Sequence, residues 1–519
     1  MAGRSPSAYS LLLIVSQALW VLPAVQPASA QVTLPPNFIS ADVPHDVPTG
    51  PSASIQDLAI FAWREFIALN WVAMDPVTTG MRGRPNVNIG VNAGFLSIKP
   101  DQNGNFPLLV WHTYRHKNEL FPANGQTDAS FDSSTPTYNY SFNGQPYTPT
   151  AGPNAGMPPA SPTLNIFNNL DETSEIGLCQ MFAHNTIRIA YEAKVSRALF
   201  DYANQNQLTN ANGEYSALTA ATQNTRYYLA LYGGTCGASA NIPIVSLPCG
   251  DAAVAGDNGE GAIEIKAAWR QLNSTEAASG RFFTQKVLFY EGEPPNQTYN
   301  NAVYGLVALH IIHKTKSFPV FVFASWEQID NYDDGAITSN TEDLKFINIG
   351  YPNSSTTDPN LNYPNSKLYP NSPPPPNLPV TRNHPIHSQV PPVNDAVHAA
   401  FTKIDPNTVW QYYKLIGVQA TPVNGPPSRT APQDDISYYY LANIVVETNQ
   451  TLQKFRGVTS LNNRDTVPER LSQRRNRKSL SDGRLSRLSR RGRTIKWRRH
   501  ERPHRLRTDQ CGGSAGVDK

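Results

Sequence analysis

Apolar residues recur every three or four positions in several stretches of the chain. This spacing predicts amphipathic helices, because about 3.6 residues complete one helical turn. Residues 54–74 (SIQDLAIFAWREFIALNWVAM) show the pattern, and the longest helical pattern runs through residues 171–206. Shorter helices are predicted at residues 394–404 and 437–455.

Short runs rich in β-branched and aromatic residues predict strands. Four of them follow one another at short spacing, which predicts neighbouring antiparallel strands: residues 262–269, 282–290, 304–313 and 318–326. A further strand is predicted around residues 409–420, and residues 107–120 begin as a strand. The order of helices, strands and helices again predicts an α+β fold, with an antiparallel sheet, packed helices and long Pro- and Asn-rich loops.

The loops set the expected domain organisation. The chain has 519 residues and 44 prolines, which predict many ordered loops rather than a compact helical bundle. Residues 351–392 consist almost wholly of turn and polyproline residues, a composition typical of a domain boundary or a long surface excursion. No internal repeat is present. The order of the predicted helices and strands leads us to expect that residues 31–457 form a single large α+β domain.

The N-terminus has the three parts of a secretory signal peptide. Arg4 supplies the positive charge, residues 11–22 form a short apolar core, and Ala28-Ser29-Ala30 is an A-x-A cleavage site. We therefore expect residues 1–30 to be removed on export, which leaves a secreted or periplasmic protein. No later stretch has the roughly 18 uninterrupted apolar residues of a membrane-spanning helix, so no transmembrane segment is expected after cleavage.

The composition changes after residue 457. Residues 458–519 contain 18 Lys and Arg residues against 6 Asp and Glu residues, whereas the rest of the chain contains 25 against 34. A disordered basic tail would bind nucleic acid or an anionic membrane through its arginines. Loss of the reading frame would also produce an Arg- and Ser-rich segment without apolar periodicity. We favour loss of frame, because the change directly follows a predicted helix of an exported protein; no nucleic-acid partner is then expected.

The four cysteines are too few for a disulfide scaffold. Cys236 and Cys249 bracket a twelve-residue loop that contains glycine and proline, and in an oxidising compartment they are the natural disulfide pair. Cys179 lies in an apolar helical pattern, which favours a buried thiol.

Two histidine pairs are candidate metal ligands. His112 and His116 are four residues apart, so they share a face of either a helix or a strand. His310 and His313 are three residues apart; they would converge on a helix but point to opposite faces of a strand, and their apolar neighbours favour a strand. A metal site needs three or four ligands. The alternative is therefore that these histidines are hydrogen-bonded groups at a sheet edge.

One acidic turn is a candidate calcium site. Asp330, Asp333 and Asp334 lie in a D-N-Y-D-D-G turn rich in oxygen ligands, but the turn lacks the full EF-hand pattern and its closing glutamate. The chain contains no P-loop, no G-x-S-x-G, no H-E-x-x-H and no C-x-x-C. These absences argue against the common nucleotide-dependent and hydrolase classes, while convergent sites without a local signature stay open.

Several ordered blocks of sequence resemble a known family. They are residues 61–71 (FAWREFIALNW), 80–85 (GMRGRP), 110–121 (VWHTYRHKNELF), 262–272 (AIEIKAAWRQL), 307–315 (VALHIIHKT), 321–331 (FVFASWEQIDN) and 438–455 (YYYLANIVVETNQTLQKF). In this order they resemble the exported bacterial proteins labelled cytochrome c family proteins, over most of residues 55–456.

The resemblance implies a haem carrier. In that family the closing helix leads into a C-terminal C-x-x-C-H segment, whose two thiolates attach the haem while its histidine ligates the iron. This chain has no C-x-x-C-H, and Cys511 is followed by two glycines. We therefore expect no cofactor in the chain as written, a c-type haem in an intact family member, and an electron-transfer or redox role for the full-length form. The redox partner or small ligand is not specified.

Two alternatives belong to other classes, so whether the chain is an enzyme stays open. One is a metal-dependent enzyme that uses His112 and His116. The other is a non-catalytic secreted protein that binds a ligand such as a carbohydrate or peptide through aromatic side chains on its loops and strands: Trp63, Trp71, Trp111, Trp269, Trp326 and Trp410.

Overall fold

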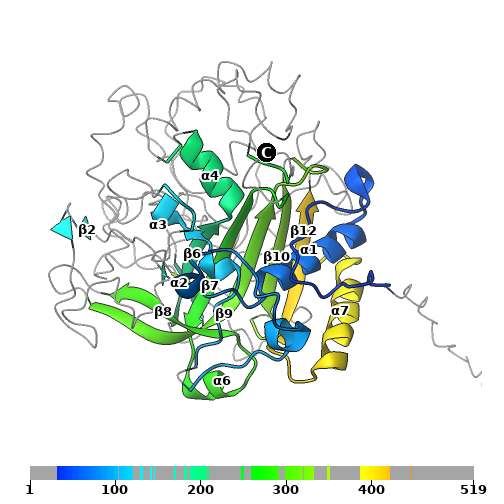
Figure 1. Ribbon diagram of the computed structural model, residues 1–519. Helices are drawn as coiled ribbons and strands as arrows, with labels where there is room; N and C mark the ends of the chain where they lie inside the picture. The colour runs from blue at the N-terminus through cyan, green and yellow to red at the C-terminus, as the bar shows by residue number, and fades with distance from the viewer. Residues whose placement is uncertain are drawn as a thin grey trace, which may run out of the picture.

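A sheet with helices packed against it forms the centre of the protein (Figure 1). The computed structural model describes residues 32–102, 104–120, 129–132, 141–142, 145–146, 169–170, 180–183, 187–206, 208–209, 236, 247–250, 259–291, 298–319, 321–331, 348–350, 386–420 and 446. Helices and strands share one core, so the predicted α+β class is confirmed.

The main path of the sheet runs in the order β11-β5-β6-β7-β9-β10-β12. Every pairing along this path is antiparallel. Outside it, β1 pairs with β6, and β8 pairs with β9 and, in parallel, with β4. The strands are β1 (Arg115–His116), β4 (Asn169–Leu170), β5 (Gln180–Ala183), β6 (Ile187–Val195), β7 (Ile263–Gln271), β8 (Thr284–Glu291), β9 (Thr298–His313), β10 (Val322–Gln328), β11 (Asn348–Gly350) and β12 (Tyr413–Ala420), and a separate pair is β2 (Ser141–Phe142) with β3 (Gln145–Pro146).

The predicted strands at residues 262–269, 282–290, 304–313 and 318–326 therefore exist as β7, β8, β9 and β10. The 16-residue β9 is the longest of the described strands. Its first half pairs with β8, and its second half lies between β7 and β10. Pairing between these neighbours is antiparallel, as predicted.

Two bulges keep the apolar side chains of the sheet on one face. Opposite β7, the extra residue of β9 is Val307, because Ala308 pairs with Ala268 and Leu306 with Trp269. Opposite β10, the extra residue of β12 is Ile416. Side chains alternate between the two faces of a strand, and one extra residue shifts this alternation by one position. With the extra residue in place, the core residues before and after each bulge point to the same face.

Helix α1 (Ile55–Leu69) covers that apolar face together with α7 (Val390–Ile404). Ser54 caps α1: its hydroxyl accepts a hydrogen bond from the Asp57 N–H, and the Asp57 carboxylate accepts one from the Ser54 N–H. Residues 71–74 do not continue the helix as predicted, because Val72 and Ala73 form β-bridges with Leu109 and Pro85.

Short elements complete the described fold. The helices are α2 (Pro76–Thr79), α3 (Lys117–Leu120), α4 (Arg197–Gln205) and α6 (Ser274–Ala278), and the single turns are η1 (Gly50–Ser52), η2 (Asn92–Leu96), η3 (Trp111–Thr113) and η7 (Val409–Tyr412). Residues 107–120 thus contain only a two-residue strand, because η3 and α3 interrupt the extended backbone.

The predicted helix over residues 171–206 is wrong for residues 180–183 and 187–195 and confirmed for α4. Residues 180–183 and 187–195 are strands, and only α4 is helical. Strand β6 pairs with β7 from Ile189 to Val195, and this cross-strand pairing outweighs the local helical spacing. The described residues leave out Cys179, most of residues 351–392, and the predicted helix at residues 437–455 apart from Val446.

Aromatic rings pack between α1 and the sheet. The ring of Phe66 lies 5.1 Å from that of Trp326 and 5.4 Å from that of Trp410, and the ring of Trp63 lies 6.0 Å from that of Trp326. The six tryptophans proposed as a ligand-binding surface are 0–4% exposed. They form the core instead, so this part of the ligand-binding prediction is wrong.

No described helix combines the length and the apolar character that crossing a bilayer requires.

Replacing Phe66 with alanine tests this core. The side chain is fully buried among Trp63, Trp326 and Trp410, so its removal should lower the free energy of unfolding by roughly 3–5 kcal/mol. Urea denaturation measures the change. The exposed Val77, replaced with alanine, is the control and should shift stability by less than about 0.5 kcal/mol. Equal effects of the two changes would contradict this core.

Candidate functional site

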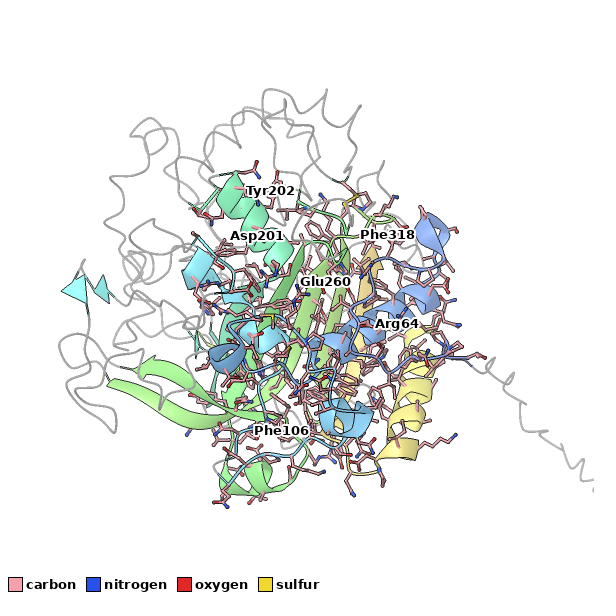
Figure 2. All side chains as sticks on the ribbon, viewed as in Figure 1. Arg64, Phe106, Asp201, Tyr202, Glu260 and Phe318 are labelled. Atoms are coloured by element: carbon pink, nitrogen blue, oxygen red, sulfur yellow. A yellow bond between two sulfur atoms is a disulfide. The ribbon has the colours of Figure 1, made fainter. Side chains whose placement is uncertain are left out.

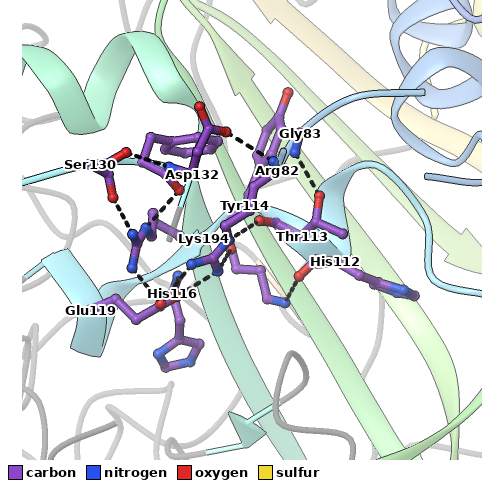
Figure 3. Close-up of polar contacts among 12 residues, drawn as sticks. Arg82, Gly83, His112, Thr113, Tyr114, His116, Glu119, Ser130, Asp132 and Lys194 are labelled. Atoms are coloured by element: carbon purple, nitrogen blue, oxygen red, sulfur yellow. Dashed lines mark hydrogen bonds and ion pairs between the residues drawn. The ribbon is translucent and has the colours of Figure 1, made fainter. Parts of the chain in front are cut away.

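A buried cluster of charges lies beside α3 and β6 (Figure 3). Arg82 donates two hydrogen bonds to Glu119, at 2.8 and 2.9 Å, and Arg115 donates one to the same carboxylate at 2.8 Å. The backbone N–H of His116 donates another at 2.9 Å. All three charged side chains are shielded from solvent. Glu119 thus has four donors on its two oxygens.

These contacts fix the ionisation of Glu119. Burial alone would raise its pKa, but the adjacent Arg82 and Arg115 outweigh burial and lower the pKa to about 2. Arg82 also donates to the backbone oxygens of Thr113 and Tyr114, at 2.7 and 3.1 Å. The cluster therefore holds the segment around residue 82 against residues 113–119. We call a buried set of charged contacts that joins two distant segments in this way a structural lock.

A second buried pair extends this polar layer. Lys194 on β6 donates to the His112 backbone oxygen at 2.5 Å and lies 3.5 Å from Glu192. The indole of Trp269 donates to Glu192 at 2.9 Å. Burial lowers the pKa of Lys194 to about 8, although Glu192 opposes this shift.

The His112 and His116 side chains do not converge. They point to different sides of the Lys194 side chain (Figure 3). His112 Nδ1 accepts a hydrogen bond from the Leu109 N–H at 3.1 Å, and burial holds the pKa of His112 well below its usual range. In the neutral ring Nε2 then carries the proton and has no lone pair for a metal. The described arrangement of His112 and His116 does not support a shared metal site, which stays a prediction.

His313 and Glu65 form a second lock between α1 and the sheet. His313 Nδ1 donates to the Glu65 carboxylate, and Nε2 donates to the backbone oxygen of Glu260, a residue labelled in Figure 2. Burial would lower the pKa of His313, but the Glu65 carboxylate and its hydrogen bond raise it instead. With both nitrogens acting as donors, His313 has no free lone pair for a metal.

His310 lies on the opposite face of β9, as the strand prediction required. Its Nδ1 is 2.6 Å from Ser325 Oγ on β10. Cross-strand register places Lys266 of β7 on the other side of His310. Further titratable side chains on this face include Glu327, which pairs with Lys414 at 3.4 Å. We call this surface the polar face; its members are Tyr191, Glu264, Lys266, His310, Phe323, Ser325, Glu327, Lys414 and Gln419.

The polar face is largely closed to solvent. Lys266 is 7% exposed, His310 5% and Ser325 1%. Buried polar side chains are costly unless they are hydrogen-bonded. The polar face gathers such side chains on the side of the sheet away from α1.

One carboxylate of the acidic turn, Asp330, lies within the described residues, and calcium binding by the turn stays a prediction. Asp330 accepts two hydrogen bonds from Arg281, at 2.7 and 2.5 Å, so a guanidinium occupies its carboxylate. Asp333 and Asp334 lie outside the described residues.

The predicted disulfide is present. Cys236 and Cys249 are bonded, with their Cα atoms 5.1 Å apart. The bond is compatible with an oxidising compartment.

Among the residues that the structure describes, no three His, Cys, Asp or Glu side chains are grouped as a metal site. Comparison of the chain with protein-family models, with curated proteins and with solved structures gives no match.

Sequence reasoning missed Glu65, Arg82, Lys194 and Ser325 as members of these contacts. A signal was available for Glu65, which falls on the apolar side of the α1 pattern, between Phe61 and Leu69. Nothing local marks Arg82, whose partner Glu119 lies 37 residues away, or Lys194, which donates to a backbone oxygen 82 residues away. Ser325 meets His310 only through the pairing of β9 with β10.

Glu119→Gln should destabilise the protein by roughly 3–5 kcal/mol at neutral pH, because it leaves Arg82 and Arg115 buried without their counter-charge. The folded pKa lies below the unfolded value, so the carboxylate's stabilisation is present above pH 4.5 and is lost as the pH falls towards about 2. Denaturant unfolding across this range should show the two proteins converging at low pH. A constant gap would contradict the lock, and the exposed Asp395→Asn serves as control.

The lock between Glu65 and His313 predicts the opposite pH dependence. The folded pKa of His313 is raised, so its stabilisation is complete below the unfolded value of 6.5 and is lost as the pH rises through the folded pKa. As the pH rises above 6.5, the free energy of unfolding of the wild type should therefore fall more steeply than that of Glu65→Gln. Guanidinium unfolding midpoints between pH 6 and 9 measure it, and parallel curves would rule the lock out.

Proposed function

We propose that this chain is an exported protein whose described residues form the α+β body of an electron-transfer protein of the cytochrome c family. The supporting observation is that the blocks of sequence that resemble this family meet in space. Arg82 of residues 80–85 binds Glu119 of residues 110–121, and Glu65 of residues 61–71 binds His313 of residues 307–315.

A third contact has the same character. His310 of residues 307–315 meets Ser325 of residues 321–331, across neighbouring strands. Blocks that are separated by up to 248 residues along the chain thus share specific buried polar contacts. Such contacts need both members, so the resembling blocks act as one scaffold rather than as independent short similarities.

The chain as written does not fit a covalently attached haem. Such attachment needs two free thiols and an adjacent histidine. Cys236 and Cys249 are joined to each other, and no cysteine of the chain begins a C-x-x-C-H. His112 and His313 have no free lone pair. The electron-transfer role therefore belongs to a form that carries the haem segment, and residues 458–519 are proposed to replace it through loss of frame.

The disulfide supports export to an oxidising compartment, together with the signal-like N-terminus. The alternative of a metal-dependent enzyme at His112 and His116 loses its support from the diverging side chains. The alternative of a tryptophan-lined binding surface loses its support from the burial of those rings.

Resequencing the gene across codons 450–519 and translating all three frames tests the proposal. We expect a C-x-x-C-H in another frame. Expressed with a c-type haem maturation system, the chain as written should show no haem after denaturing electrophoresis, whereas the frame-restored chain should retain about one equivalent, measured as the pyridine haemochrome.

The matched control replaces both cysteines of the restored motif with serine, which should abolish the retained haem. Absence of the motif from every frame would remove the electron-transfer role. Covalent haem on the chain as written would show that the fit argument is wrong.

A further inference from the structure

One of the six core tryptophans differs from the others in the acceptor of its indole N–H. The Trp269 N–H donates to the Glu192 carboxylate at 2.9 Å, and both side chains are fully buried. Among the described residues, no acceptor lies within reach of the Trp326 N–H. The other four indoles donate to amide or peptide oxygens: Trp63 to Asn394, Trp71 to Asn86, Trp111 to Asn70 and Trp410 to Phe95.

This difference gives Trp269 a chemistry that its neighbours lack. A carboxylate accepts a proton far more readily than an amide oxygen does. We propose that Trp269 is a redox-active residue, which gives one electron to an oxidising radical while its indole proton passes to Glu192. The proposal uses residues of the described body and goes beyond the proposed haem-dependent role.

The register of β6 and β7 sets the contact between the two residues. Glu192 pairs with Ala267, and Trp269 follows two positions later on the same strand. The two side chains therefore lie on the same face of the sheet as diagonal neighbours. Because paired backbone holds both residues, the donor and the acceptor are in place before any electron is lost, and the proton crosses only one hydrogen bond.

The step balances in atoms and electrons. The oxidising radical takes one electron from the indole ring and is reduced. Loss of that electron makes the indole N–H a strong acid, because the ring shares its positive charge with Nε1. The N–H bond then breaks, and an O–H bond forms on Glu192 Oε1, the atom that already accepts the hydrogen bond. The products are a neutral tryptophan radical and a neutral glutamic acid.

The charges around Trp269 favour oxidation there over its neighbours. An isolated charge is costly to bury, so a radical cation is unfavourable at Trp326, whose N–H has no described acceptor. At Trp111, Lys194 Nζ lies 5.5 Å from the ring centroid, and this cation opposes the loss of an electron from the ring. Lys194 also donates to the His112 backbone oxygen at 2.5 Å, a contact that it keeps when Glu192 takes up the proton.

Burial does not isolate Trp269 from an oxidant, because an electron passes between neighbouring aromatic rings without any molecule entering the core. A row of rings joins Trp269 to Trp71, which is 4% exposed and the least buried of the six tryptophans. The centroid distances along the row are 6.4 Å from Trp269 to Phe283, 5.2 Å on to Trp410, 5.3 Å to Phe95 and 6.5 Å to Trp71. An oxidising radical at the surface therefore draws its electron through this row.

Azide radicals generated by pulse radiolysis take single electrons from tryptophan and supply the test. Every sample is the full chain with Trp20→Phe and Trp497→Phe, so that tryptophan signals arise from the six core residues. Transient absorption distinguishes the neutral tryptophan radical from the radical cation. We expect the neutral radical in the folded parent chain and its loss in Trp269→Phe. The matched control is Trp326→Phe, which removes an equally buried indole without a described acceptor and should keep the signal.

Glu192→Gln tests the proton transfer, because the amide oxygen still accepts the hydrogen bond but does not take the proton. We expect this variant to lose the neutral radical as well. Circular dichroism checks that each variant folds, and the spectrum of the parent chain does not depend on Glu192→Gln. Absence of the neutral radical from the folded parent chain overturns the proposal, as does a signal that Trp269→Phe or Glu192→Gln leaves unchanged. None of these results bears on haem attachment, so failure of this proposal and failure of the electron-transfer proposal are distinguishable.

Discussion

Successive side chains of β9 point to opposite faces of the sheet, and the described structure depends on this alternation. The strand lies between β7 and β10 and places His313 towards α1 and His310 towards the polar face. A slip of one residue in its pairing would exchange the two faces. Glu65 would then lose its buried partner, and an imidazole would replace apolar side chains under α1.

The bulges and the locks follow from that constraint. Extra residues at Val307 and Ile416 keep core side chains on both sides of each bulge on the helix side, as Leu306 and Leu309 are in β9. The charges buried on this side are held by close partners, as Glu119 is by Arg82 and Arg115. Breaking a buried ion pair is expensive. Such pairs therefore fix the relative position of segments that the apolar core alone would leave free to slide.

Sequence reasoning succeeded where the signal is local. The periodicity of α1, and the β-branched runs of β7 to β10, are set within each segment, so the α+β class and the opposite orientation of His310 and His313 were predictable. It failed at residues 187–195, where pairing with β7 outweighs helical spacing. It also did not find the contacts of the buried histidines, because their partners lie far away along the chain: Glu65 lies 248 residues from His313.

Long-range ¹H–¹⁵N correlation spectra of histidine-labelled protein test the central claim most directly. That claim is that contacts within the fold set the protonation of two buried histidines: the Leu109 N–H donates to His112 Nδ1, and the Glu65 carboxylate lies against His313 Nδ1. Variants at His112 and His313 assign the signals. At pH 6 the account predicts His313 with both nitrogens protonated and His112 neutral with its proton on Nε2. A neutral His313, or a His112 with its proton on Nδ1, would contradict it.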